Sequence, residues 1–459
     1  MNLEPIDVVV IGAGPAGMAG ARTLAELGIS VVLLDEQVAA GGQIYRGITS
    51  ASPARREMLG PDYAAGSSLA DALKGSMVRH ETGASVWQVT RERQVHYLKD
   101  RRVRSFAAKS VLLATGAMER PFPIPGWTLP GVMTAGAAQI LLKTAGIGPQ
   151  GPVVLAGCGP LLYLLGWQYL RAGIAISALV DTSRRDDYWR ARGHLLEALR
   201  AWPYLRKGIS LLRALRKGEV PHYTGAEGLQ VEGEAQVQAL SFVVDGQQHR
   251  LPASTVLLHQ GVVPNIQFTQ ALRAQHRWDD AQLCFVPEID QWGRLDVPFI
   301  SAAGDGTGIG GAQAAALQGQ LAALGLARDL GRITPAQRDS RAAPLRDQLE
   351  KNLRIRPFLD ALYRPRDENR IPPRDDVTIC RCEEVTAGDI RRFVELGCSG
   401  PNQAKSFGRC GMGPCQGRMC GLTVTEIIAR TRGLSPDEVG YFRIRPPIKP
   451  ITLGELASG

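Results

Sequence analysis

Six of the eight cysteines in this 459-residue chain lie between residues 380 and 420. Cys380-x-Cys382 opens the group and Cys415-x4-Cys420 closes it, with 32 residues between the two pairs. Glycine-rich backbone beside the thiols, as in RCGMGPCQGRMCG (409–421), lets N–H groups turn toward sulfur. Two close pairs that are far apart in sequence are able to supply four thiolates to one compact centre.

Three kinds of thiol chemistry compete for this pattern. A disulfide knot is disfavoured, because the chain opens without a secretory signal and thiols in a reducing compartment stay reduced. Four-cysteine zinc sites usually use CxxC pairs, and neither pair has that spacing. The pattern favours a [2Fe-2S] cluster bound by Cys380, Cys382, Cys415 and Cys420, with zinc and a redox disulfide as the alternatives. Cys410 is surplus and is the candidate to replace Cys415.

A dinucleotide site is predicted at the start of the chain. The stretch DVVVIGAGPAGMAGARTLAELGISVVLLDE (7–36) has the order strand, glycine turn, helix, strand, acid. The glycines permit a tight turn and close approach of a pyrophosphate to the helix N-terminus, and an acid about 20 residues on takes a ribose hydroxyl. The predicted binding residues are Gly12, Gly14, Pro15, Ala16, Gly17, Asp35 and Glu36.

Two later strands end in similar turns. SVLLATGA (110–117) runs into Thr115–Gly116, and FISAAGDGTGIGGAQAAALQGQLAA (299–323) runs into Gly304–Asp305. Together with the first turn they resemble the two-dinucleotide-binding-domain flavoproteins, the disulfide-reductase-like class of glutathione and thioredoxin reductases. The resemblance implies FAD, with the carboxylate of Asp305 on its ribityl or pyrophosphate region. It also implies cofactor contacts from Gly41, Gly42 and Gln43 of GGQIYR, and from Val86, Thr115, Gly116 and Gly304.

A second glycine turn lies in GPVVLAGCGPLLYLLGWQYLRAGIAISALVD (151–181). It reads Gly157-x-Gly159-x-x-Leu162 and the next strand ends at Asp181. Leu162 occupies a position where close helix–strand packing requires a small residue. We therefore expect a nicotinamide-domain fold, and binding of NAD(P) stays open.

Disulfide reductases of this class pass electrons through a CxxC or CxxxxC pair beside the flavin. The first 379 residues hold only Cys158 and Cys284, which are expected to be buried and inert. Cys398 follows a helical stretch and is expected to be a packed thiol. Flavin electrons must therefore pass to another acceptor. The scattered histidines indicate no general acid or base, so the catalytic residues are unknown.

Over nearly its whole length the chain resembles one family. The resemblance rests on VVVIGAGPAG, DEQVAAGGQIYR, ATGAMERPFPIPGWTLPGVMTAGAAQILLK, the Gly304–Asp305 turn, RCEEV with GMGPCQGRMCG, and RPPIKPITLGELA. The family is the FAD-containing α subunit of heteromeric opine (octopine/nopaline-type) and D-hydroxyproline or proline dehydrogenases, and the flavin-carrying subunit of hydrogen cyanide synthase is a cousin. The cysteine segment is similar to the bacterioferritin-associated-ferredoxin-like [2Fe-2S] domain, whose two ligand pairs match the four cysteines named above.

This resemblance implies an electron-transfer role, in which a partner, a D-amino-acid-oxidase-like β subunit, oxidises the amine. It further implies a small ferredoxin-like γ subunit, with FMN at a subunit junction. Substrate identity (octopine, nopaline, hydroxyproline, proline or glycine), stoichiometry and electron acceptor are not encoded in this chain. The alternatives are a stand-alone NAD(P)H-dependent flavin reductase, a non-catalytic nucleotide-binding scaffold and a hydrogen cyanide synthase subunit.

The composition, 44% hydrophobic and 21% charged, is typical of a cytoplasmic globular protein, and no apolar run is long enough for a transmembrane segment. Much of the net charge of +9 falls in 182–219, which is expected to form helices with a basic face or subunit contact. No nucleic-acid-binding signature accompanies it, so no nucleic-acid partner is expected.

The predicted fold class is α/β, with a small C-terminal [2Fe-2S] domain. The expected domains are a split FAD domain (1–118 and 271–335), a nicotinamide-like domain (119–270), a helical and Pro-rich linker (336–376), the cluster domain (377–435) and an extended tail (436–459).

Overall fold

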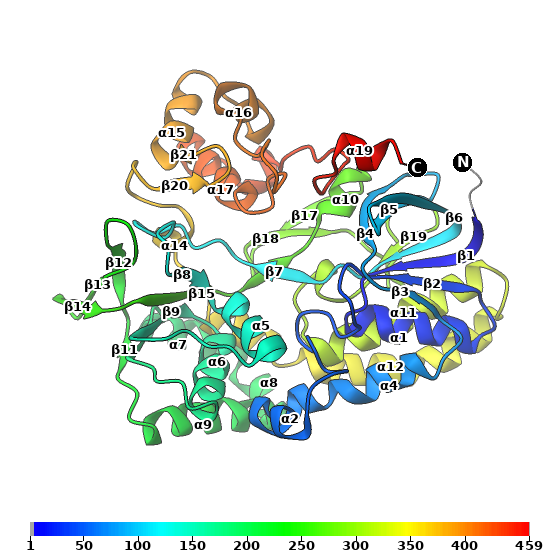
Figure 1. Ribbon diagram of the computed structural model, residues 1–459, viewed down its shortest axis with the longest axis horizontal. Helices are drawn as coiled ribbons and strands as arrows, with labels where there is room; N and C mark the ends of the chain where they lie inside the picture. The colour runs from blue at the N-terminus through cyan, green and yellow to red at the C-terminus, as the bar shows by residue number, and fades with distance from the viewer. Residues whose placement is uncertain (1–3, 459) are drawn as a thin grey trace. The chain divides into compact units, whose positions relative to one another are not determined.

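The computed structural model describes residues 4–458. The chain divides into two compact units. The first unit comprises Met1–Met118, Val263–Leu353 and Arg443–Gly459, and the second unit comprises Glu119–Val262 and Arg354–Phe442. Both units combine helices with β-sheets (Figure 1), which confirms the predicted α/β class.

The first unit is built on a sheet with the order β3-β2-β1-β6-β5-β4, and β19 pairs with β6. Strands β1, β2, β3, β6 and β19 pair in parallel, whereas β4, β5 and β6 form an antiparallel meander. The bounds are β1 Glu4–Ile11, β2 Val31–Leu34, β3 Arg79–Glu81, β4 Ser85–Val89, β5 Gln94–Lys99, β6 Arg102–Leu113 and β19 Ile300–Ala302.

Strand β6 belongs to both parts of this sheet. Its first half alternates between buried and more exposed residues, as in a meander with one solvated face. Its last four residues, 110–113, are all buried between β1 and β19. The strand therefore delivers the Thr115–Gly116 turn to the same sheet edge as the turn that follows β1.

Helices cover this sheet. Helix α1 (Pro15–Glu26) packs against α11 (Ala312–Asp329), and the two run along one face of the sheet (Figure 1). The other elements of the unit are α2 Pro53–Leu59, α3 Pro61–Ala64, α4 Gly66–Lys74, α10 Gln267–Ala271, β17 His276–Asp279, β18 Cys284–Pro287, η2 Gly304–Thr307, α12 Pro335–Leu353 and α19 Leu453–Leu456. Where the chain passes from one unit to the other it forms β7 (Ala117–Glu119) and β16 (Val262–Pro264).

The second unit holds a parallel sheet with the order β11-β10-β9-β15-β8. An antiparallel meander, β12-β13-β14, completes its core. The bounds are β8 Val132–Thr134, α5 Ala135–Ala145, β9 Val153–Cys158, α6 Pro160–Arg171, β10 Ala178–Asp181, α7 Arg185–Ala191, η1 Arg192–His194, α8 Leu195–Arg200, α9 Trp202–Lys217, β11 His222–Thr224, β12 Glu227–Glu232, β13 Ala239–Val244, β14 Gln247–Pro252 and β15 Thr255–Gln260.

The cysteine-bearing segment also belongs to the second unit. It comprises α13 Arg356–Leu362, α14 Asp367–Arg370, β20 Thr378–Cys380, β21 Val385–Thr386, α15 Ala387–Glu395, α16 Pro401–Gly408, α17 Gly421–Arg432 and α18 Pro436–Val439. The indole of Trp127 donates to the carbonyl of Thr378 at 2.6 Å, and Val377 joins the core of the meander. These contacts fix the start of β20, and with it Cys380.

Within residues 4–458, no helix has both the length and the apolar character required to cross a membrane.

Candidate functional site

The first glycine turn joins β1 directly to α1, which begins at Pro15 after Gly14. A Cβ on Gly17 would lie 1.8 Å from the carbonyl oxygen of Gly12, so only glycine allows the helix to start this close to the strand. The backbone N–H of Ala13 donates to Asp35 Oδ2 at 2.5 Å. The turn is therefore held closed from both sides.

The two predicted acids have different surroundings. Asp35 is buried, and its two carboxylate oxygens accept hydrogen bonds from the backbone N–H groups of Ala13 and Gln37. The Glu36 side chain is 50% exposed and forms an ion pair with Lys449 of the C-terminal segment. Asp35 thus organises the turn, whereas Glu36 remains accessible at its mouth.

The predicted loop 41–43 lies against this turn. Gly41 donates its N–H to the carbonyl of Ala13 at 2.8 Å. A Cβ on Gly42 would lie 2.8 Å from Gly14 Cα, so the two backbones touch. Gln43 follows with an exposed side chain.

The turns after β6 and β19 reach the same sheet edge. A Cβ on Gly304 would lie 2.8 Å from Ala16 Cβ, and one on Gly306 would lie 3.4 Å from both the carbonyl of Gly116 and Thr115 Oγ1. Segments near residues 14, 115 and 304 therefore meet at the carboxyl ends of parallel strands, where ligands bind in open α/β sheets.

Asp305 and Val86 complete the predicted set. Asp305 is half-buried, and its Oδ1 accepts the N–H groups of Gly310 and Gly311 at 2.9 Å, at the N-terminus of α11. Val86 is buried in β4, just beyond the N–H of Ala84, which donates to the Asp35 carbonyl. These residues fit a dinucleotide, because close packing at the glycines brings three turns together into a cradle at the N-termini of α1 and α11.

The second glycine turn has a different environment. Leu162 is fully buried, and the carboxylate of Asp181, 2% exposed, accepts hydrogen bonds from the Tyr163 hydroxyl and the Ser183 N–H. Asp181 occupies the position of a ribose-binding acid in such domains. Here a side chain of α6 takes the place of the ribose.

The chain segment that follows α13, residues 363–366, is called the connector below, and it lies across the same turn. The Tyr363 ring lies 6.1 Å from that of Tyr163, and Cys158 Sγ lies 3.6 Å from the Tyr363 carbonyl. Arg366 Nε donates to the Thr182 carbonyl at 3.0 Å. Burial raises the pKa of the Cys158 thiol to about 12, which agrees with an inert cysteine. Nothing in the residue spacing indicated that the connector, at separations of 184 and 205 residues, would cover this turn.

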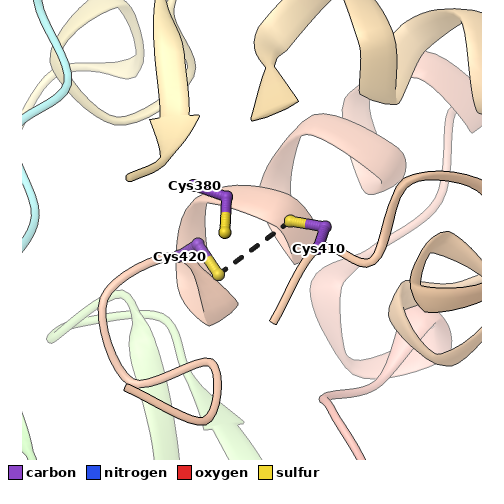
Figure 2. Close-up of side chains that lie close together, drawn as sticks. All are labelled: Cys380, Cys410 and Cys420. Atoms are coloured by element: carbon purple, nitrogen blue, oxygen red, sulfur yellow. Dashed lines mark hydrogen bonds between the residues drawn. The ribbon is translucent and has the colours of Figure 1, made fainter. Parts of the chain in front are cut away.

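Three cysteines form the closest thiol group of the part of the chain that the structure describes. Cys380 ends β20, Cys410 follows α16 and Cys420 immediately precedes α17, and their sulfurs all lie within 4.8 Å of one another (Figure 2). Cys410 and Cys420 are 4.0 Å apart at Sγ, which is a contact between free thiols.

The other two predicted ligands lie beside this group. Cys382 is exposed and Cys415 is half-buried. Burial raises the pKa of the Cys382 thiol, and the neighbouring Cys415 thiol adds to this rise. A Cβ on Gly413 would lie 3.1 Å from Cys382 Sγ, so the loop 410–415 crosses directly over Cys382. Five thiols thus share one loop cluster, and the predicted ligand set of Cys380, Cys382, Cys415 and Cys420 stays a prediction.

Electrostatics favours the thiolate form of one cysteine in this cluster, Cys380. Hydrogen bonds from Cys410 and Cys420 lower the pKa of the Cys380 thiol to about 2. Their interaction with Cys380 raises the pKa values of Cys410 and Cys420 in turn. Cys420 also stands at the N-terminus of α17, whose dipole stabilises negative charge.

An aromatic side chain supports the cysteine loop from beneath. The buried ring of Phe442 packs against Gly411 and Gly417, and a Cβ added to either glycine would lie only 2.7 Å from a ring carbon. Both glycines also have positive φ. This residue was not predicted, because nothing in its spacing marks it. An all-sulfur donor set on a glycine-rich loop fits a [2Fe-2S] cluster.

The geometry defines a class of oxidoreductase with two dinucleotide-type folds and a thiol centre. A family model described as pyridine nucleotide-disulphide oxidoreductase matches residues 6–319, and one described as sarcosine oxidase A3 domain matches residues 377–459. The first family implies FAD, in agreement with the cradle described above. The predicted disulfide-reductase-like fold class is confirmed.

Several relatives match nearly the whole chain. The opine oxidase A subunit of Rhizobium meliloti is 45% identical, over 99% of this chain and 88% of the relative. Hydrogen cyanide synthase subunit HcnB from Pseudomonas aeruginosa is 32% identical, over 98% of this chain and 97% of the relative. The crystal structure of L-proline dehydrogenase from P. horikoshii shares the fold, with a TM-score of 0.72 at 19% identity over 99% of this chain and 80% of that one. The chain belongs to the family of opine oxidase A subunits, which confirms the resemblance and the oxidoreductase assignment.

Proposed function

We propose that the chain is the electron-transfer subunit, carrying FAD and a [2Fe-2S] cluster, of a heteromeric enzyme that oxidises a secondary amine or amino acid. The substrate class is an opine such as octopine or nopaline, or D-hydroxyproline or proline. Oxidation takes place in a D-amino-acid-oxidase-like β subunit, and the electrons go to an acceptor other than oxygen. The relatives are named as subunits, which supports a multi-subunit enzyme.

The observation that carries the proposal is the combination of a dinucleotide cradle with a thiol cluster in a chain that lacks a flavin-side dithiol. Cys158 and Cys284, the only cysteines before the cluster segment, are both buried, and they are too far apart in sequence to form a CxxC or CxxxxC pair. A bound flavin accepts an electron pair and releases the electrons singly, and a [2Fe-2S] cluster carries one at a time. The cysteines that a disulfide route would need are missing beside the flavin, and the cluster segment supplies an alternative route.

The second glycine turn supports a donor other than NAD(P)H. The Tyr163 hydroxyl is hydrogen-bonded to Asp181, and the connector residue Tyr363 packs against Tyr163. A nicotinamide dinucleotide would have to displace both tyrosines to reach the acid. A stand-alone NAD(P)H-dependent reductase is for this reason the weaker alternative.

In the proposed cofactor sites each protein group has a defined task. The N–H groups at the starts of α1 and α11 would hold the FAD pyrophosphate region, with Asp305 orienting the second of these turns. Glu36 would take a ribose hydroxyl, because Asp35 is already engaged by backbone. Cys380, Cys382, Cys415 and Cys420 would hold the cluster iron.

The test is co-purification of the tagged chain from its native operon, followed by anaerobic visible spectra with octopine, nopaline, D-hydroxyproline, proline, glycine and NADH. Iron and acid-labile sulfide are assayed in the same sample. We expect a second, oxidase-like chain, and bleaching of flavin and cluster bands by one amine. A chain that purifies alone and is bleached only by NADH would contradict the proposal, and bleaching by glycine alone would favour the cyanide-synthase alternative.

A further inference from the structure

The helical segment 185–217 presents an apolar surface that the function above leaves unexplained. We define the basic apolar patch as Trp189, Leu195, Leu196, Leu199 and Trp202, which are exposed by 66%, 42%, 76%, 49% and 51%. Leu195 and Leu199 are four residues apart on α8, so they share one face of that helix, and Trp202 is the first residue of α9. Scattered exposed apolar residues are normal, but five large exposed apolar residues within fourteen positions are a concentration that points to an interaction site.

The opposite face of these helices is already used. Ala198 and Ala201 are buried together with Ile355, and Leu205, Phe358 and Leu359 pack against them. Within the second unit, α13 therefore covers the inner side of α8 and the start of α9. The patch is the outer side, and its leucines are not required to complete this core.

Charge indicates which occupant fits. Residues 185–217 contain nine arginines and lysines, all exposed, against three acidic residues. One of the acids, Asp187, is buried and paired with Arg190 and Arg366, and another, Glu197, pairs with Arg200. The segment that carries the patch is therefore strongly positive, so a second copy of the same segment would be repelled and an acidic surface attracted.

We propose that the basic apolar patch is the docking surface for an acidic, apolar-centred face of the partner subunit in the heteromer. This inference rests on the proposed function, because it takes its occupant from it. Large aromatic and aliphatic side chains would form the buried centre of the interface and the arginines its polar rim. An anionic membrane surface is the competing occupant and is tested in the same experiment.

The experiment uses the tagged full-length chain, co-purified with its partner from the native operon. The variant Leu196→Ser/Leu199→Ser/Trp202→Ser removes the centre of the patch, and Leu396→Ser, 64% exposed in the cluster segment, is the matched control. We expect at least about tenfold weaker partner binding for the triple variant and unchanged binding for the control. Flavin content and circular dichroism establish that both variants fold.

A charge-reversal variant, Arg206→Glu/Arg213→Glu, tests the rim without touching apolar contacts. We expect slower partner association and a weaker dependence of the association rate on salt. Wild-type affinity in both patch variants would overturn the inference. The inference would also be overturned if the wild-type complex bound phosphatidylglycerol vesicles, the patch variants did not, and both variants kept wild-type affinity for the partner.

The two proposals fail in different ways. If the partner chain co-purifies in a patch-dependent manner but no amine bleaches the flavin, the functional proposal is wrong and the docking surface stands. If an amine bleaches the complex and the patch variants keep the partner, the docking surface is wrong and the function stands. If no partner accompanies the wild-type chain, both are wrong.

Discussion

At the scale of single residues, Gly17 sets the distance between α1 and β1. Adding one methyl group in Gly17→Ala places a Cβ on the Gly12 carbonyl, and we expect this overpacking to cost about 1–3 kcal/mol. If this cost falls on the cofactor-bound state, FAD binds about five- to 150-fold more weakly. Flavin absorbance of the purified protein measures this. Gly193→Ala, where a Cβ meets no neighbour, is the control and is expected to keep its flavin.

Two single cysteine variants distinguish the predicted ligand set from the buried trio. If Cys380, Cys382, Cys415 and Cys420 are the ligands, Cys415→Ser loses iron, acid-labile sulfide and the cluster absorbance, whereas Cys410→Ser keeps them. If instead the buried trio of Figure 2 provides the ligands, the two variants exchange phenotypes. Cys398→Ser, whose thiol donates to the Gly400 carbonyl outside the cluster, keeps the iron in either case.

One half-buried histidine makes stability depend on pH. Burial lowers the pKa of His276 to about 4 from its usual 6.5. Between these values the unfolded chain binds a proton that the folded chain does not, so stability falls as pH decreases from 6.5 to 4, by about 3 kcal/mol in total. Urea unfolding of His276→Gln across this range is expected to show a flatter pH dependence.

At the scale of elements, α14 and α17 are joined by a buried ion pair between Arg370 and Glu426, which are 6% and 3% exposed. Arg370→Ala leaves the Glu426 carboxylate buried without its partner, at an expected cost of about 3–5 kcal/mol. The double variant Arg370→Met/Glu426→Leu removes both charges and is expected to recover most of this loss. Urea unfolding of the two variants measures the difference, and equal destabilisation would show that the ion pair is not the cause.

Around the second glycine turn, one feature was predictable from the sequence and another was not. Leu162 indicated an altered dinucleotide site, because its size is visible in the turn motif itself. The contributions of Tyr163 and Tyr363 depend on the path of the connector after α13, which is set by tertiary packing. Periodicity reports which face of an element is apolar, but not which distant segment will cover it.

At the scale of the whole molecule, the α/β class, the oxidoreductase family and the strand–turn–helix units were predictable from the sequence, because glycine turns and buried parallel strands have strong local signatures. The convergence of the segments near residues 14, 115 and 304 followed from the family resemblance. Three features were not predictable, because each depends on side-chain packing over long sequence separations. They are the thiol trio that includes Cys410, the packing of Phe442 under the cysteine loop, and the different surroundings of Asp35 and Glu36.

The C-terminal segment 443–459 is part of the first unit. Ile444 and Ile448 are each 2% exposed, and the Ile448 N–H donates to the Trp87 carbonyl at 3.0 Å. Deleting 443–459 removes both isoleucines from the core, at about 3–6 kcal/mol, and frees Glu36 from Lys449. We expect lower thermal stability and lower flavin retention. The exposed Leu453→Ser is the control, and a truncated protein with wild-type flavin and midpoint would contradict this role.

The first unit is assembled from three separate stretches of the chain. During translation the dinucleotide turn emerges early, yet Lys449, which contacts Glu36, follows it by 413 residues. The ribosome must therefore synthesise the whole of the second unit before the first unit is complete. We therefore expect a polypeptide that ends before residue 443 to retain FAD less well than the full chain, even if every glycine of the turn is present.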